Sequence, residues 1–167
     1  YAADGRLTGF SKILRDMTQW KQSEQALQES HRRLQAILAS IPAALVLIDA
    51  STGRFSYMNP RALELYGRDY VDVDLHVHLE AVAALRLDGT SIPTDELPVM
   101  RSLGDQETVF GEEMLIHRAD GSVVPVAVSC APLYDRHGQV DSAVVVFDDI
   151  SPRLLAEEAT MAAEEVA

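Results

Sequence analysis

The sequence predicts an α+β domain built on an antiparallel sheet, because strand patterns and helix patterns occupy separate stretches of the chain. The strongest pattern spans residues 107–151, where three apolar, β-branched runs are separated by Asp120-Gly121 and His137-Gly138. Each break holds a glycine, which adopts a positive φ at little cost, so hairpins are the expected connections. A shorter hairpin and several helical segments precede this meander, and an amphipathic stretch follows it.

The second run of the meander indicates a sheet that protein covers on both faces. Alternation places Val126, Val128 and Cys130 on one face, and Pro125 and Ala127 on the other. Neither face is charged, so a sheet with one solvated face is not expected. We interpret Cys130 as a packed side chain of the strand rather than as a nucleophile.

Composition narrows the class of protein. The chain has 167 residues, is 47% hydrophobic and carries a net charge of −12, which argues against a nucleic-acid partner and against acidic membrane surfaces. It holds no apolar run long enough to span a membrane and no signal-peptide pattern. A single cysteine excludes an internal disulfide and fits a reducing cytoplasm. Because the chain begins at Tyr1 rather than Met, we expect a piece of a longer protein.

Residues 1–18 repeat the pattern of residues 134–151. Identical residues occupy three pairs of positions: Tyr1 and Tyr134, Gly5 and Gly138, and Asp16 and Asp149. Both segments end on an acidic residue, an apolar residue and a hydroxyl residue, and then enter a charged helical stretch. We therefore predict that residues 1–18 are the last hairpin strand of a preceding domain of the same kind.

Residues 19–41 are predicted to form a connecting helix, since no glycine or proline interrupts them. Large apolar residues recur every seventh position at Trp20, Leu27, Leu34 and Ile41. The complementary positions of a heptad hold polar residues, so an isolated coiled coil would be weak. Two interpretations stay open: a seam between two copies of the chain, or one amphipathic helix lying on its own sheet.

A hairpin and a short helix follow Pro42. Strand patterns at 44–49 and 54–58 are joined by a turn that contains Gly53. Asn59-Pro60 then supplies an N-cap and a first-turn proline, and Gly67 stands where a helix commonly ends in a left-handed residue.

Residues 70–80 alternate strictly between apolar and polar side chains. As a strand, this segment would align one row of possible ligands: Asp72, Asp74, His76, His78 and Glu80. Imidazole and carboxylate groups in such a row suit a transition metal, whereas on a helix the two histidines would diverge and the site would vanish. The alternative is a solvated acidic edge, which we prefer because no further ligand motif supports chelation.

Further helices are expected at 78–87 and at 94–103, the second capped by Thr94 and stopped by Gly104. After the meander, Ser151-Pro152 opens an amphipathic helix, so residues 152–167 are predicted to leave the domain as a helix.

This order of elements resembles the PAS (Per-ARNT-Sim) sensory domain over residues 31–151, with the domain itself at 42–151. The residues that carry the resemblance are Asp49, Asn59-Pro60, Gly67, Asp120-Gly121, Pro132-Leu133, Gly138 and Asp149-Ile150-Ser151. Residues 9–18 look like the tail of an upstream PAS copy.

The resemblance implies a five-stranded antiparallel sheet with short helices on one face and flanking N- and C-terminal helices. It places a pocket on the helix-covered face, with Val126, Val128 and Cys130 as candidate lining residues. It also implies that a signal leaves the domain at Asp149, Ile150 and Ser151, and that the flanking helices form a homodimer.

Known chemistries of the family can be compared with these residues. The photoactive flavin type requires a cysteine in an Asn-Cys-Arg-Phe-Leu context on a helix, whereas Cys130 lies on a predicted strand. Haem-binding relatives often carry an axial histidine on the helix before the long strands, and residues 94–103 contain none. A small organic ligand, or no ligand, is therefore the expectation.

These features predict a cytoplasmic sensory and dimerisation module of a multidomain signalling protein, such as a sensor histidine kinase. Diguanylate cyclases and other outputs are compatible with the same fragment. The fragment has no catalytic constellation and no glycine-rich phosphate loop, so we do not expect it to be an enzyme. Its expected partners are a second copy and the adjacent domains of its own polypeptide. The alternative function is a metal-binding protein or enzyme that uses the row from Asp72 to Glu80.

Overall fold

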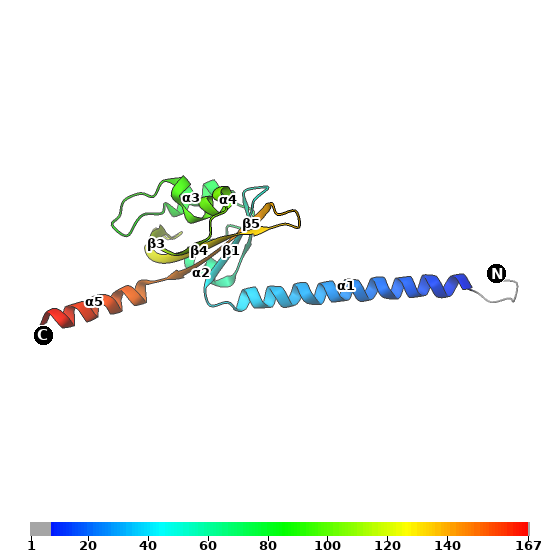
Figure 1. Ribbon diagram of the computed structural model, residues 1–167. Coiled ribbons are helices and arrows are strands. Elements are labelled where there is room, and N and C mark those ends of the chain that lie inside the picture. Colours follow the sequence, from blue (N-terminus) through cyan, green and yellow to red (C-terminus); the bar gives the residue numbers. More distant parts are fainter. Residues whose placement is uncertain (1–7, 167) are drawn as a thin grey trace. The chain divides into compact units, whose positions relative to one another are not determined.

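The computed structural model describes residues 8–166, and side chains from residue 16 onward. The chain divides into two compact units, Tyr1–Ser40 and Ile41–Ala167. Over its described residues, the first unit is a single helix, α1 (Thr8–Ser40). The second unit contains a sheet, several short helices and a final helix, α5 (Ser151–Val166) (Figure 1).

Helix α1 extends further toward the N-terminus than the sequence predicts. The connecting helix is present, but residues 8–18 are helical rather than a strand. A strand satisfies its backbone groups only by pairing with a neighbour, whereas a helix satisfies them within itself, so an unpaired segment of this kind favours the helix. The part of the predicted strand at residues 1–7 lies outside the described residues.

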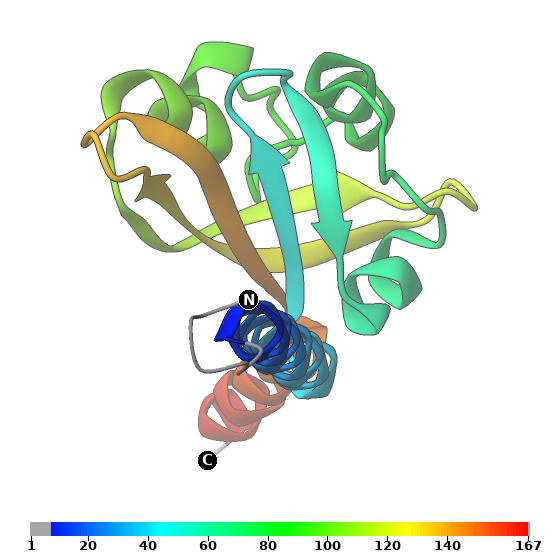
Figure 2. The ribbon, with the colours of Figure 1, turned by 90° about the vertical axis from the view of Figure 1, so that its right-hand side faces the viewer.

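The second unit is built on one antiparallel sheet of five strands in the order β2-β1-β5-β4-β3 (Figure 2). Its hairpins turn at Gly53, Gly121 and Gly138, and all three have a positive φ. The sheet and the meander predicted from residues 107–151 are thereby confirmed. The strands are β1 (Ala44–Asp49), β2 (Arg54–Met58), β3 (Val109–His117), β4 (Val123–Tyr134) and β5 (Val140–Asp149).

Short helices connect β2 to β3, and α3 and α4 lie against one face of the sheet (Figure 1). The predicted helix at 94–103 is divided, because Leu97 between its two parts has an extended backbone, and its second part runs past Gly104. The elements are α2 (Pro60–Tyr66), α3 (Leu75–Val82), the 3-10 turn η1 (Thr94–Glu96) and α4 (Pro98–Asp105).

The strand interpretation of residues 70–80 is wrong beyond Asp74, whose side chain caps helix α3. The helix separates the two candidate metal ligands, since His76 is exposed and His78 is buried. Among the described residues, no group of three or more His, Cys, Asp or Glu side chains could hold a metal ion. The row from Asp72 to Glu80 therefore does not form a metal site.

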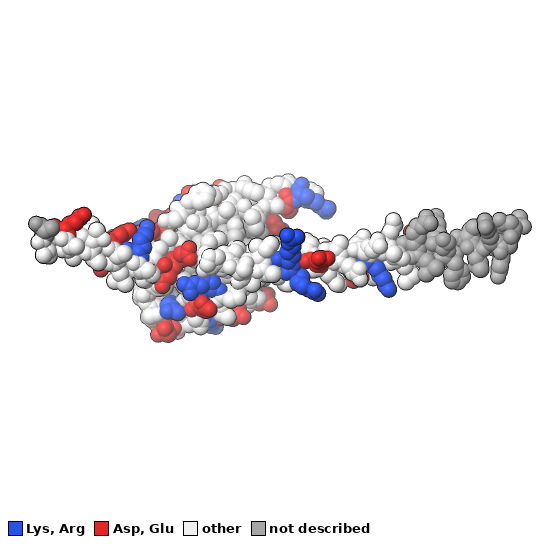
Figure 3. Space-filling view, turned by 90° about the horizontal axis from the view of Figure 1, so that it is seen from below, with Lys and Arg blue, Asp and Glu red and all other residues white. Residues whose placement is uncertain are grey.

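The two faces of the sheet differ in burial. Val126 and Phe147 on the helix-covered face are almost fully buried, whereas Ala127, Val144 and Val146 on the opposite face are only partly buried. On the side of the molecule seen in Figure 3, basic and acidic side chains are interspersed. Among the described residues, no helix has both the length and the apolar character that crossing a lipid bilayer requires.

Candidate functional site

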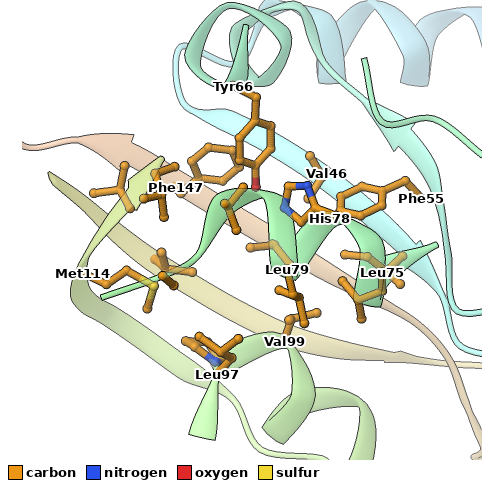
Figure 4. A pocket seen from close by; sticks show the side chains of 18 residues that line it. Val46, Phe55, Tyr66, Leu75, His78, Leu79, Leu97, Val99, Met114 and Phe147 are labelled. Carbon is orange, nitrogen blue, oxygen red and sulfur yellow. The ribbon is translucent and has the colours of Figure 1, made fainter. Parts of the chain in front are cut away.

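A cavity of about 60 Å³ lies between the sheet and the short helices. All five strands and helices α2, α3 and α4 contribute to its wall of 18 residues (Figure 4). Every lining side chain is apolar except Tyr66 and His78. An apolar enclosure with few polar groups is the usual form of a small-molecule site.

His78 is the most unusual residue of this wall. It lies on α3 with 3% of its surface exposed, and its Nδ1 atom has no hydrogen-bond partner among the described residues. The imidazole packs against three rings, with centroid distances of 4.6 Å to Phe55, 4.7 Å to Tyr66 and 4.3 Å to Tyr70. Burial lowers the pKa of His78 from 6.5 to about 3, so the ring is neutral at physiological pH.

Tyr66, the last residue of α2, faces the same space. Its ring lies 4.8 Å from that of Phe147, and Figure 4 shows its hydroxyl pointing toward His78. Burial raises the pKa of the Tyr66 phenol, so the hydroxyl keeps its proton. The cavity therefore holds two neutral polar groups side by side.

Asn59 fixes the first turn of α2. Its Oδ1 accepts hydrogen bonds of 2.9 Å from the backbone N–H groups of Ala62 and Leu45, and its Nδ2 donates to the Ala43 carbonyl. The side chain is fully buried, so it joins the helix to strand β1 without competition from water. This is the N-cap that the Asn59-Pro60 pair predicts.

Arg118, at the turn between β3 and β4, holds the other end of α2. Its guanidinium donates to the carbonyls of Leu65 at 2.8 Å and Glu64 at 3.0 Å. The Ala119 N–H donates to the Tyr66 carbonyl at 2.9 Å. The last carbonyls of α2 are thus paired with a cation and a neighbouring backbone, which favours a fixed position for Tyr66.

Helix α3 is held by a backbone hydrogen bond of 2.8 Å from the Leu75 N–H to the Gly53 carbonyl and by side-chain contacts at its two ends. The partly exposed Asp74 caps it, its carboxylate accepting from the His76 N–H at 2.9 Å. Its last turn meets the His117 ring, whose Nδ1 lies 3.2 Å from the Val82 and Ala83 carbonyls. Ala83 ends the helix with a φ of 38°, in the left-handed region that side chains other than glycine adopt at some cost.

Only two of the three predicted pocket residues line the cavity. Val126 and Val128 line the cavity, whereas Cys130 is buried on the same face but does not line it. The Cys130 thiol lies beside the buried hydroxyl of Ser102, and burial raises the pKa of the thiol. Its place is explained by α4, which covers this end of β4.

The predicted exit residues join the sheet to α5. The Asp149 Oδ1 accepts from the Ser151 N–H at 2.8 Å, while the buried Ile150 donates its N–H to the Pro125 carbonyl at 3.0 Å. The Ile150 carbonyl accepts from the Leu154 N–H at 3.0 Å, which closes the first helical turn. Residues 149–151 therefore link the end of β5 both to strand β4 and to the first turn of α5.

A second link to α5 comes from the edge strand. Arg153, in the first turn of α5, forms an ion pair with Glu113 of β3. Glu113 is the neighbour of Met114, which lines the cavity, and Asp149 lies two residues after Phe147, which also lines it. Strands β3 and β5 thus each carry both a cavity residue and a contact to the exit helix.

The seam residues lie mainly on α1. Trp20, Leu27 and Leu34 are each more than half exposed, at 66%, 72% and 54%. Ile41, the fourth position of the repeat, lies just after the end of α1 and is partly buried.

The cavity residues do not fit a photoactive flavin or a haem. Helix α3 contains no cysteine, and the only cysteine of the chain does not line the cavity. His78 is the one histidine of the wall, but a cavity of about 60 Å³ is smaller than the roughly 150 Å³ that accommodates benzene.

Sequence reasoning missed the role of His78, although a signal for it was present. Leu75, His78, Leu79 and Val82 follow the i, i+3, i+4, i+7 spacing of a buried helical face, and all four line the cavity. The strict alternation across residues 70–80 obscured this spacing, because both patterns share Leu75 and Leu79.

Comparisons with known proteins agree with this architecture. The chain superposes on the PAS domain of an HTR-like protein from Haloarcula marismortui with a TM-score of 0.56 and 22% identity, covering 78% of this chain and 99% of that one. A PAS domain from Colwellia psychrerythraea gives 0.54 and 20%, with coverages of 73% and 97%. The PAS domain of nitrogen regulation protein NR(II) from Vibrio parahaemolyticus gives 0.51 and 16%, with coverages of 70% and 96%.

None of the curated proteins compared with the chain matches it significantly. At these identities the structural matches establish the fold alone. The sequence model of the PAS domain family matches residues 42–152, which is the sheet, its short helices and the start of α5. The chain therefore belongs to the PAS domain family.

Proposed function

We propose that this chain is the sensory and dimerisation module of a multidomain signalling protein, with a sensor histidine kinase as the parent. The module relays changes in its cavity or interface to helix α5, and through α5 to an output domain. A cytoplasmic location is part of the proposal, because the single cysteine is a free thiol.

One observation carries the sensory role: the strands that line the cavity are those that hold the exit helix. Phe147 faces the cavity, and Asp149 on the same strand binds the first turn of α5. Met114 faces the cavity, and the adjacent Glu113 binds Arg153. A side chain displaced within a closely packed core shifts its strand, so movement in the cavity reaches α5 along two strands.

Dimerisation is proposed to use the seam of α1. This helix of 33 residues exposes Trp20, Leu27 and Leu34 at intervals of seven. A second copy of the helix would bury these side chains in the pattern of a coiled coil. Because the intervening heptad positions are polar, we expect contacts from the rest of the domain to be needed for a stable dimer.

Relay from cavity to exit helix can be tested without knowing the ligand. Val128→Leu adds a methylene to the cavity wall and mimics partial occupation. Amide hydrogen exchange of α5 should change in this variant, beginning at Ser151. The control is Val146→Leu, which makes the same change on the opposite face of the sheet. Equal exchange in α5 of both variants and the wild type would contradict the sensory role.

The dimer is tested by Leu34→Glu, which places a charge in the seam. Sedimentation should show a larger monomer fraction than in the wild type. Gln35→Glu adds the same charge at the adjacent exposed position and should leave the distribution unchanged. An unaltered dimer in Leu34→Glu would reject the seam.

A further inference from the structure

The cavity is polar at one place only, and it carries no charge there. None of its lining residues is Lys, Arg, Asp or Glu, and its two polar groups, Tyr66 and His78, are neutral at physiological pH. An ion that entered would lose its hydration without gaining a counter-charge. The wall therefore selects an uncharged molecule.

His78 marks where the polar group of such a molecule would lie. Its buried Nδ1 has no hydrogen-bond partner among the described residues, although nearly all buried polar atoms in proteins have one. The rings of Phe55, Tyr66 and Tyr70 pack around the imidazole without supplying that bond. A neutral imidazole has one donor and one acceptor nitrogen, so a hydroxyl group, which can donate and accept, suits either tautomer.

The volume of the cavity sets the size of the molecule. A dry cavity of about 150 Å³ holds benzene, with its six carbons. By that scale, about 60 Å³ accommodates roughly two to three non-hydrogen atoms.

We propose that the cavity binds a small uncharged molecule of two to three non-hydrogen atoms, represented by a short alcohol, whose hydroxyl group forms a hydrogen bond with the imidazole of His78. This rests on the proposed sensory function, for which it names the class of ligand. The apolar part of the molecule contacts Val126, Val128 and Phe147, which lie on the sheet side of the cavity.

The test is an NMR titration of the whole chain with three probes. Ethanol and formate each have three non-hydrogen atoms but differ in charge, and xenon reports an accessible apolar cavity. Ethanol should shift the methyl signals of Val126 and Val128 and the ring nitrogen signals of His78 in a saturable manner. A ligand this small binds at millimolar concentration or more weakly, so the titration extends well beyond that range. Formate at the same concentrations should cause no saturable shift.

His78→Leu isolates the hydrogen bond, since leucine has a similar size and no polar atom. It should weaken ethanol binding about tenfold while xenon still enters, which also shows that the variant folds with its cavity intact. Val146→Leu, on the other face of the sheet, should bind ethanol like the wild type.

Three results would overturn the proposal: formate binding as tightly as ethanol, ethanol binding that His78→Leu leaves unchanged, or no entry of ethanol into wild-type protein. Each is distinct from failure of the sensory role. That role is tested by the response of α5 to Val128→Leu, which needs no ligand. If Val128→Leu changes the exchange of α5 but the wild type binds no alcohol, only the proposed ligand class is rejected and the sensory role stands.

Discussion

Helices α2 and α3 both line the cavity, but they are held in opposite ways. The buried Asn59 joins the start of α2 to strand β1, and Arg118 pairs with the carbonyls at its end. Helix α3 is capped by the partly exposed Asp74, and its buried face contains the His78 Nδ1, which has no hydrogen-bond partner among the described residues. Buried, fully paired polar groups fix a position, whereas exposed caps and unpaired groups stabilise it little.

The comparison assigns different roles to the two helices. We expect α2 to be the fixed wall that presents Tyr66, and α3 to be the wall that opens at a lower free energy. Regions that respond to ligands come from the less stable parts of a fold, because the response requires a low free energy of local opening. Breaking the contacts of α2 should therefore lower the free energy of unfolding more than breaking those of α3.

The largest expected effect is that of Asn59→Ala. The variant loses the N-cap of α2 and leaves the Leu45 N–H without its buried acceptor, so the free energy of unfolding should fall by about 3 kcal/mol. Urea denaturation measures this loss. Asp74→Ala removes the partly exposed cap of α3 and should lower the free energy of unfolding by about 1 kcal/mol. Equal losses would remove the distinction between the two helices.

The next effect depends on pH and involves His78. In the folded protein burial lowers the pKa of His78 from 6.5 to about 3, so below pH 6.5 the unfolded chain binds a proton that the folded chain does not. The contribution of the neutral ring to the free energy of unfolding is therefore fully present above pH 6.5. It is lost progressively as the pH falls from 6.5 toward 3. The rings that pack on the imidazole belong to Phe55, Tyr66 and Tyr70, none of which is a carboxylate or a basic side chain.

His78→Leu lacks this titration. Its free energy of unfolding should lie within about 1 kcal/mol of the wild type at pH 7, and the difference should then move in favour of the variant by about 1.4 kcal/mol per pH unit between pH 6 and pH 4. Urea denaturation at a series of pH values measures the difference. Parallel acid profiles for the two proteins would show that His78 takes up its proton as readily in the folded state as in the unfolded chain.

A smaller effect is expected for Arg118→Leu. The variant loses the two hydrogen bonds to the end of α2, and the free energy of unfolding should fall by about 1–2 kcal/mol, with faster amide exchange in α2. Arg61→Leu, which removes an exposed ion pair on α2 itself, should cost less than about 0.5 kcal/mol. If the two variants were equally stable, Arg118 would not anchor the helix.

The smallest effect on stability is that of Arg153→Gln. Its ion pair with Glu113 is partly exposed, so its loss should cost less than about 0.5 kcal/mol. The amides in the first turn of α5 should nevertheless exchange faster, because one of the two links to the sheet is gone. Glu157→Gln removes only the longer pair of Arg153, at 3.8 Å, and serves as the control. Unchanged exchange in Arg153→Gln would show that the ion pair with Glu113 does not hold α5 to the sheet.

Helix α2, the better anchored of the two helices, is also the one that the sequence predicted well. Asn59, Pro60 and Gly67 act locally, through a cap, a fixed φ and a left-handed residue, so their positions alone define α2. The meander was predictable for the same reason, since its turns and alternation are short-range signals. In both regions local preferences agree with the final fold.

Helix α3 and its histidine depend on tertiary contacts instead. The alternation of residues 70–80 fits a strand, but Val71 and Asp74 make only isolated bridges to Phe55 and Arg54, and the helix begins at Leu75. Burial of the face that contains His78 requires the sheet beneath it, which no local pattern supplies. The position of Cys130 outside the cavity likewise depends on α4, which comes from elsewhere in the chain.

Amide hydrogen exchange of α2 and α3, compared within one sample, tests the central claim most directly. The account predicts that α3 (Leu75–Val82) opens at a lower free energy than α2 (Pro60–Tyr66) in the wild type. In Val128→Leu, exchange should change in α3 and α5 and stay constant in α2. Equal opening of the two helices, or a change confined to α2, would contradict the division into a fixed wall and a responsive wall.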